Sequence, residues 1–140
     1  CMTEQLIIEL HRKTMKELTR AEEQIMQILW RIGKGHVNDL LEYFPEPKPA
    51  YNTVSTIIRI LEKKEFVDHE AIGKSHRYFP KVSKREYARF TMKQMLNGYF
   101  SNSYKQMVSF FTREHDLSLK EMEEIRQLIE QQIHQKKQLP

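Results

Sequence analysis

Residues 50–64 read AYNTVSTIIRILEKK, and their side chains form two stripes when this stretch is wound as an α-helix. One stripe is apolar and has the spacing i, i+3, i+4 and i+7 of a helix face that packs on a core. It consists of Val54, Ile57, Ile58 and Leu61. The other stripe is displaced by two residues, which is about 200° of helical rotation. It consists of Asn52, Ser55, Thr56, Arg59 and Lys63. We therefore expect a helix from about Ala50 to Lys64 whose polar face points away from the core.

The polar stripe has side-chain chemistry that suits duplex DNA. Asn pairs with adenine through two hydrogen bonds, Arg binds guanine or phosphate, and Ser and Thr reach base edges or phosphates. Any amphipathic surface helix carries a polar stripe, but this one has no acidic residue between Asn52 and Arg59. We predict DNA contacts from the helix at Tyr51, Asn52, Thr53, Ser55, Thr56, Arg59 and Lys63.

The flanking elements follow the order of a winged helix-turn-helix. Thr19 and Glu22 have the spacing of a capping box, which predicts a helix from about Thr19 to Ile32. A second, short helix is expected from Val37 to Phe44, before three closely spaced prolines. After the 50–64 helix, residues 66–70 and 76–79 are predicted strands around a turn that contains glycine. Three helices and a hairpin place the third helix where such folds bind DNA.

The predicted hairpin tip, residues 73–77, is a second candidate for DNA contact. Lys74 and Arg77 are placed to hold backbone phosphate, and His76 can donate when it is protonated. The alternative is an ordinary solvated turn. We favour phosphate contact because the tip follows the 50–64 helix directly.

The remaining chain, residues 83–140, is predicted to be helical. Ala88, Met92, Met95 and Tyr99 form a near-heptad seam, and Asn97-Gly98 predicts a break. Another apolar face consists of Tyr104, Met107, Val108 and Phe111. Ser118 and Glu121 have capping-box spacing and open a last helix. Its residues expected to point inward are Met122, Ile125, Leu128, Ile129 and Ile133.

These elements predict a mainly α fold with a small β-hairpin wing, divided into two domains. Residues 1–82 are expected to form a winged helix-turn-helix domain with an N-terminal helical extension at 2–18, and residues 83–140 a helical dimerisation domain. The predicted dimer contacts are Met92, Met95, Leu96, Tyr99, Phe110, Phe111, Ile125 and Ile129. The alternative is that several of them form only a core within one chain.

Composition permits a nucleic-acid partner without establishing one. The 140 residues carry a net charge of +4, and the excess of Lys and Arg lies wholly in residues 81–140. The chain has no apolar run near the roughly 20 residues of a membrane span, its start is too polar for a secretory signal, and its one cysteine forms no internal disulfide. We expect a cytoplasmic protein.

No pattern in the chain predicts an enzyme, a cofactor or a metal site. A phosphate-cradling glycine loop and a His-Glu-x-x-His pair are both missing, and the six histidines are scattered. Glu114, His115 and Asp116 offer ligand atoms, but a solvated turn is the favoured interpretation. A small metal-dependent hydrolase would need ligands that converge from distant segments.

Taken together, the motifs resemble the penicillinase-repressor family of BlaI and MecI type, which also includes CopY-like copper repressors. The resemblance covers about Leu18 to Ile133. It rests on Leu18-Thr19-x-Ala21-Glu22, Ile28-Leu29-Trp30, Thr53-Val54-x-Thr56-Ile57-Ile58-x-x-Leu61-x-x-Lys64, Tyr78-Phe79-Pro80-x-Val82-Ser83 and Asn97-Gly98.

This resemblance implies a homodimeric repressor on a near-palindromic operator, controlling antibiotic-resistance-type genes without a small-molecule ligand. It also implies a membrane-bound sensor protease that cleaves the C-terminal domain. The family's Asn-Phe cleavage site aligns with Ser109-Phe110, which departs from the pattern at the first residue. Glu65 replaces a usual glycine, at a cost of roughly 1 kcal/mol if φ is positive there. The copper branch uses a C-terminal cysteine cluster, which this chain lacks.

A different function remains compatible with the same fold. A winged-helix module can bind a protein partner instead of DNA, because a fold alone does not determine function. The salt dependence of binding separates the two possibilities, since contacts to several phosphates weaken steeply as ionic strength rises.

Overall fold

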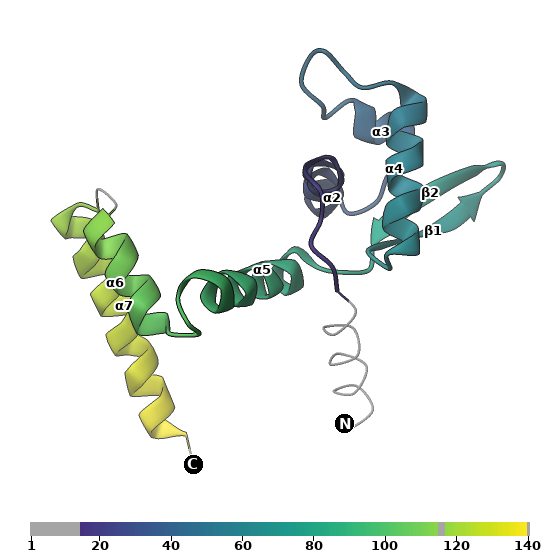
Figure 1. Cartoon of the computed structure of the whole chain (residues 1–140). Helices are drawn as coiled ribbons and strands as arrows, with labels where there is room; N and C mark the ends of the chain where they lie inside the picture. Colours follow the sequence, from purple (N-terminus) through teal and green to yellow (C-terminus); the bar gives the residue numbers. More distant parts are fainter. Residues whose placement is uncertain (1–14, 115–116, 140) are drawn as a thin grey trace. The chain divides into compact units, whose positions relative to one another are not determined.

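The computed structural model describes residues 15–114 and 117–139 (Figure 1). The elements are α2 Arg20–Ile32, α3 Val37–Leu41, α4 Tyr51–Lys63, β1 Val67–Ile72, β2 Ser75–Pro80, α5 Lys84–Tyr99, α6 Tyr104–Glu114 and α7 Leu119–Gln138. The predicted fold class, mainly α with one β-hairpin, is confirmed. Packing divides the chain into two units, the first ending at Met92 and the second beginning at Lys93. Most of the predicted 2–18 helix, and the His115-Asp116 pair, lie outside the described residues.

The predicted capping box opens α2. The Thr19 hydroxyl accepts a hydrogen bond from the Glu22 amide at 3.2 Å, and the Glu22 carboxylate accepts one from the Thr19 amide at 2.8 Å. Glu22 is also buried against Lys64, whose ammonium lies 2.8 Å from its carboxylate. Burial raises the pKa of Glu22, but the hydrogen bonds from Lys64 and Thr19 outweigh it and leave the pKa below its ordinary value. This cap therefore also fastens the start of α2 to the end of α4.

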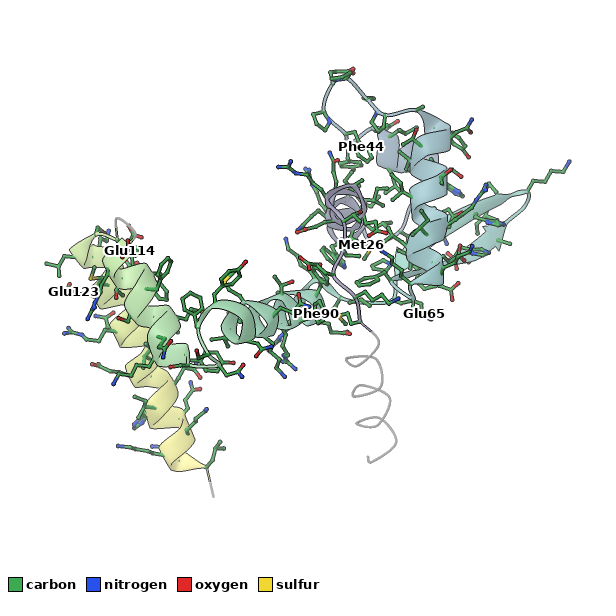
Figure 2. All side chains as sticks on the ribbon, in the orientation of Figure 1. Met26, Phe44, Glu65, Phe90, Glu114 and Glu123 are labelled. Carbon is green, nitrogen blue, oxygen red and sulfur yellow. The ribbon has the colours of Figure 1, made fainter. Side chains whose placement is uncertain are left out.

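A single apolar core holds the three helices and the hairpin together. The face predicted for α4 is confirmed, with Val54, Ile58 and Leu61 buried and Ile57 partly buried against them. Side chains from α2, from α3 and from the residues that follow α3 pack in the same core, and Figure 2 labels Met26 of α2 and Phe44, which follows α3. The buried cluster is Leu18, Ile25, Met26, Ile28, Leu29, Val37, Leu40, Phe44, Val54, Ile58, Leu61, Phe66, Val67, Tyr78, Val82 and Tyr87.

The α3 helix is shorter than predicted, because it ends at Leu41 and not at Phe44. The amides of Tyr43 and Phe44 bond to carbonyls three residues back, at 3.1 and 3.3 Å, so the last turn tightens. Pro45 follows and has no amide with which to continue the helix. Phe44 is nevertheless buried, as the apolar spacing predicted.

The hairpin is attached to the helices by two backbone hydrogen bonds. Gly35, in the loop between α2 and α3, donates to the Tyr78 carbonyl at 2.9 Å and accepts from the Tyr78 amide at 2.8 Å. A Cβ on Gly35 would lie 2.9 Å from Ile32 Cδ1, so a larger residue here would require the Ile32 side chain to move. The turn is tighter than predicted, since Ile72 pairs with Ser75 and only Gly73 and Lys74 remain between the strands.

The first unit extends beyond the hairpin into α5. Tyr87 is buried, and its hydroxyl accepts a hydrogen bond from the Leu18 amide at 2.9 Å. The Trp30 indole donates to the Val82 carbonyl at 2.8 Å. The start of α5 is thus packed on the winged-helix core, ten residues past the predicted boundary at 82 and up to Met92.

Glu65 adopts the left-handed backbone that the family pattern implied, with φ of 69°. This conformation lets the Phe66 amide bond to the Leu61 carbonyl at 3.0 Å, which closes the end of α4 and starts the hairpin. A side chain at this φ costs about 1 kcal/mol relative to glycine. The Glu65 carboxylate forms an ion pair with Lys81, whose pKa is raised by that hydrogen bond.

We expect Glu65→Gly to be more stable than Glu65→Ala by about 1 kcal/mol. Both changes remove the ion pair with Lys81, so the difference isolates the backbone conformation. Urea unfolding monitored by Trp30 fluorescence measures it. Equal stability of the two variants would show that the left-handed turn carries no cost here.

In the second unit, α5 continues through Asn97 and Gly98 and ends at Tyr99, so the predicted break at that pair was wrong. A glycine inside a helix costs only about 1 kcal/mol, which neighbouring turns can offset. The helix ends instead where Ser101 and Asn102 take positive φ of 51° and 60°. The Asn102 amide then bonds back to the Leu96 carbonyl at 2.9 Å.

The inward face predicted for the last helix is not buried within the chain. Of its residues, only Ile125 is partly buried, while Leu128, Ile129 and Ile133 are 47–55% exposed. Among the described residues from 93 onward, Leu96 alone is buried. Ser118 does cap α7, since its hydroxyl accepts from the Glu121 amide at 3.1 Å. The last helix is therefore present as predicted, but the described residues supply almost no buried core for it.

Candidate nucleic-acid interface

Helix α4 presents most of the predicted polar stripe to solvent. Asn52, Thr56, Arg59 and Lys63 are exposed, as are Tyr51 and Thr53 in the first turn. The Thr56 hydroxyl donates to the Asn52 carbonyl at 2.8 Å, within the same helix. The expectation of an exposed stripe was wrong at Ser55, which is only 8% exposed. Ser55 lies beneath the stripe, on the side that faces the hairpin.

A groove of ≈ 520 Å³ lies between α4 and the hairpin. Tyr51, Ser55 and Arg59 line it from α4, and Lys74 and His76 line it from the hairpin. The structure therefore brings together residues from both predicted DNA-contacting segments. All five carry a hydroxyl, a guanidinium, an ammonium or an imidazole, and Asp39 is the one acidic residue among those that line the groove.

His36 also lines this groove, and its contribution is not apparent from the sequence. Its ring Nδ1 lies 2.9 Å from the His76 carbonyl. Because a carbonyl only accepts, Nδ1 must carry the proton. Its backbone amide donates to Asp39 at 2.9 Å at the start of α3. The His36-x-x-Asp39 spacing could have signalled the helix start, but not the contact with the hairpin.

The hairpin residues differ in how free they are to meet a ligand. Lys74 is exposed in the turn. Arg77 lies opposite Glu70 in the register and donates to it from Nε at 2.7 Å. That hydrogen bond, together with the positive charges of Arg77 and Lys34, lowers the pKa of Glu70. Desolvation acts in the opposite direction but is outweighed. A phosphate must therefore compete with Glu70 for Arg77, whereas Lys74 is available directly.

His76 is exposed, and its ring stacks on that of His69 with 4.0 Å between centroids. The rings are nearly parallel, at 10°. The stack holds His76 on the face of the hairpin that also carries Tyr78, whose ring meets it edge-on at 6.2 Å. Burial, followed by the charge of Glu62, raises the pKa of Tyr78, so its hydroxyl remains neutral.

The predicted dimer contacts fall into two groups. Five are well exposed: Met92, Met95, Tyr99, Phe110 and Ile129. Tyr99 is 83% exposed, and Phe110 contacts Phe100 with 5.5 Å between ring centroids. Leu96 is buried within the chain, while Phe111 and Ile125 are partly buried. Exposed apolar side chains in such number are typical of an interaction surface.

No helix in the described part of the chain combines the length and the apolar character required to cross a membrane.

Comparison with known proteins places these features in a family. The model of the penicillinase repressor family matches residues 18–131. The methicillin resistance regulatory protein MecI of Staphylococcus aureus strain N315 is 28% identical over 114 residues, covering 81% of this chain and 93% of MecI. The penicillinase repressor of Bacillus licheniformis is 23% identical over 127 residues, covering 90% and 99%. A solved structure of BpsR from Bordetella bronchiseptica has a TM-score of 0.44 at 16% identity, covering 92% and 87%.

The family match extends from the residue before the α2 cap into α7, and so includes the hairpin, helices α2 to α6 and part of α7. The family consists of transcriptional repressors and not of enzymes, which confirms the prediction made from the missing catalytic motifs. Because the family model covers most of its residues, the chain belongs to the penicillinase repressor family of DNA-binding transcriptional repressors.

Proposed function

We propose that the chain represses transcription as a homodimer on a near-palindromic operator, with one α4 in the major groove of each half-site. The observation that supports this most directly is the exposed stripe of Asn52, Thr56, Arg59 and Lys63 beside the Lys74 turn. A helix of 13 residues is about 20 Å long and fits a groove about 12 Å wide. In this arrangement Asn52 and Arg59 reach base edges.

The first turn of α4 favours a phosphate. Its cap residue, Ala50, makes no side-chain hydrogen bond, and the turn contains no acidic residue. Helices α2 and α7, by contrast, begin with a capping hydroxyl and have Glu in the first turn. Amides at a helix start attract anions when nothing in the protein satisfies them. A DNA phosphate at this position, with Tyr51 beside it, would fix the register of α4 in the groove.

The partner that covers the second unit is, on this proposal, a second copy of the chain. A helical segment without its own core is not stable alone, and its exposed apolar faces require a complementary surface. Residues 93–140 carry seven Lys and Arg and six Asp and Glu, so two copies meet with almost no net repulsion. When two winged helices are linked in a dimer, the second binds its half-site without the entropy cost of a separate association.

We propose that induction acts on this same helical unit, residues 93–140. Ser109 and Phe110 lie within α6, so the bond between them is helical while the unit is intact. A sensor protease would need α6 to open locally before cleavage. Cleavage there separates α7 from α5 and removes the dimer contacts proposed for Phe110, Phe111, Ile125 and Ile129. The names of the relatives, a methicillin resistance regulator and a penicillinase repressor, support antibiotic-resistance genes as targets.

Footprinting of the purified chain on the DNA upstream of its own gene tests the proposal. We expect a two-fold footprint whose half-sites are separated by one helical turn or a multiple of it. Affinity should fall by orders of magnitude between low and moderate salt. A chain that gives no footprint at low salt would favour the protein-binding alternative.

Lys74→Ala is expected to weaken binding to all duplexes by the same factor. Each phosphate contact contributes about 0.9 to the slope of log affinity against log salt, so a dimer that loses two contacts loses about 1.8. Lys120→Ala, an exposed lysine on α7, removes the same charge away from the hairpin and should leave the slope unchanged. Fluorescence anisotropy across a salt series measures both. An unaltered slope for Lys74→Ala would exclude the turn from the interface.

A further inference from the structure

Folding brings three metal-ligating side chains together where the sequence alone suggested none. Glu62 lies in the last turn of α4, and Asp68 and His69 are consecutive residues of β1. One ligand atom from each residue lies within 4.8 Å of the other two. The cluster lies at the end of α4, and its three residues are not among those that line the groove beside Lys74.

Glu62 and His69 are partly sheltered, Asp68 is the most exposed of the three, and the imidazole of His69 is held in place. The side chains of Glu62 and His69 are 27% and 31% exposed. His69 Nδ1 contacts a Glu62 carboxylate oxygen directly. The imidazole is stacked on His76 and meets the Tyr78 ring edge-on at 5.8 Å. A ring that its neighbours already orient loses little freedom when it binds an ion.

The composition of the cluster matches a divalent cation. Two carboxylates and one neutral imidazole carry a charge of −2, which a divalent ion neutralises. Imidazole with carboxylate is a common donor set for zinc and neighbouring transition metals, whereas calcium and magnesium prefer oxygen alone. Ligands of tetrahedral zinc lie about 3.4 Å apart, which follows from bonds of about 2.1 Å. The three atoms now lie within 4.8 Å of one another, so the side chains must adjust to hold one ion.

We propose that Glu62, Asp68 and His69 form a binding site for a divalent transition metal of the zinc class. The ion replaces the direct contact between His69 and Glu62 and is completed by water. It joins the end of α4 to the first strand of the hairpin, the two segments that must be held together to contact DNA at once. Bound metal therefore stabilises the hairpin against α4, and this consequence for DNA rests on the proposed function.

Zinc titration of the tag-free full chain, stripped with a chelator and dialysed, tests the site by calorimetry. We expect one zinc per chain, with affinity reduced at least tenfold in His69→Gln and in Glu62→Gln. His134→Gln, an exposed histidine on α7, is the matched control and should bind zinc as the unmodified chain does. The nitrogen chemical shift of the His69 ring should change on binding.

Absence of one-to-one binding, or an unchanged affinity in both His69→Gln and Glu62→Gln, overturns the site. If His69→Gln fails to fold, as judged by circular dichroism, Asp68→Asn takes its place beside Glu62→Gln. The titration contains no DNA. If the chain binds its operator but not zinc, the metal site is wrong and the proposed function stands. If the chain binds zinc but no operator, the metal site stands and the proposed function is wrong.

Discussion

Met95→Glu combined with Ile129→Glu is expected to convert the dimer into monomers and to lower operator affinity at least 100-fold. The two side chains are 45% and 47% exposed, one on α5 and the other on α7, and we propose that a second chain covers both. Each glutamate would place an unpaired carboxylate in an apolar contact, at a cost of several kcal/mol. A monomer then binds one half-site at a time and loses the advantage of linkage, which amounts to about 10²- to 10⁴-fold.

Sedimentation equilibrium measures the mass of the variant, and gel shift measures its affinity. Gln94→Glu with Gln127→Glu is the matched control, because it adds the same two charges at exposed polar positions of the same helices. The control should stay dimeric and bind normally. Both proteins should unfold at the temperature of the unmodified winged helix, since their substitutions lie outside its core. A dimeric Met95/Ile129 variant would place the interface elsewhere.

The winged-helix elements were predictable because their signals are local. Thr19 and Glu22 identify a helix start from spacing alone, and that cap is present. The α4 helix was predicted to within one residue at each end, since its apolar residues repeat with the helical period. The left-handed backbone at Glu65 was expected only from the family resemblance, because a glycine is usual at that position.

The sequence did not predict which residues outside the main apolar face of a helix are buried by a neighbouring element. Ser55 belongs to the polar stripe by spacing, yet it is buried because the hairpin and α3 lie beside that edge of α4. The apolar face of α7 was found correctly, but periodicity does not say whether the same chain or another one covers it. Spacing identifies a face. Only the tertiary arrangement identifies what meets it.

Side-chain pairs across the hairpin depended on a register that the sequence left open. A five-residue turn was predicted, and the structure has two residues between the paired ends. That register sets Glu70 opposite Arg77. The arginine predicted to bind phosphate therefore forms an ion pair within the hairpin. It also places the ring of His69 against that of His76, two residues whose sequence positions showed no relation.

Arg59→Ala is expected to lower affinity for the operator by about 1 to 3 kcal/mol, which is about 5- to 150-fold, with little effect on random DNA. Arg59 is exposed at the middle of the stripe and lines the groove beside the hairpin, so its guanidinium can form two hydrogen bonds with a guanine edge. Those hydrogen bonds exist only on the correct sequence. Their loss therefore reduces the ratio of specific to non-specific affinity.

Lys63→Ala provides the contrast within the same helix. Lys63 lies one turn further along, at the end of α4, and in the proposed arrangement its side chain reaches the DNA backbone and not the base edges. Its removal should weaken operator and random duplexes equally, because every sequence has the same phosphates. Competition gel shifts at one fixed salt concentration compare the two variants directly. If Arg59→Ala also weakens both duplexes equally, Arg59 binds phosphate, and the base-reading residues must be sought nearer the start of α4, at Asn52 and Thr56.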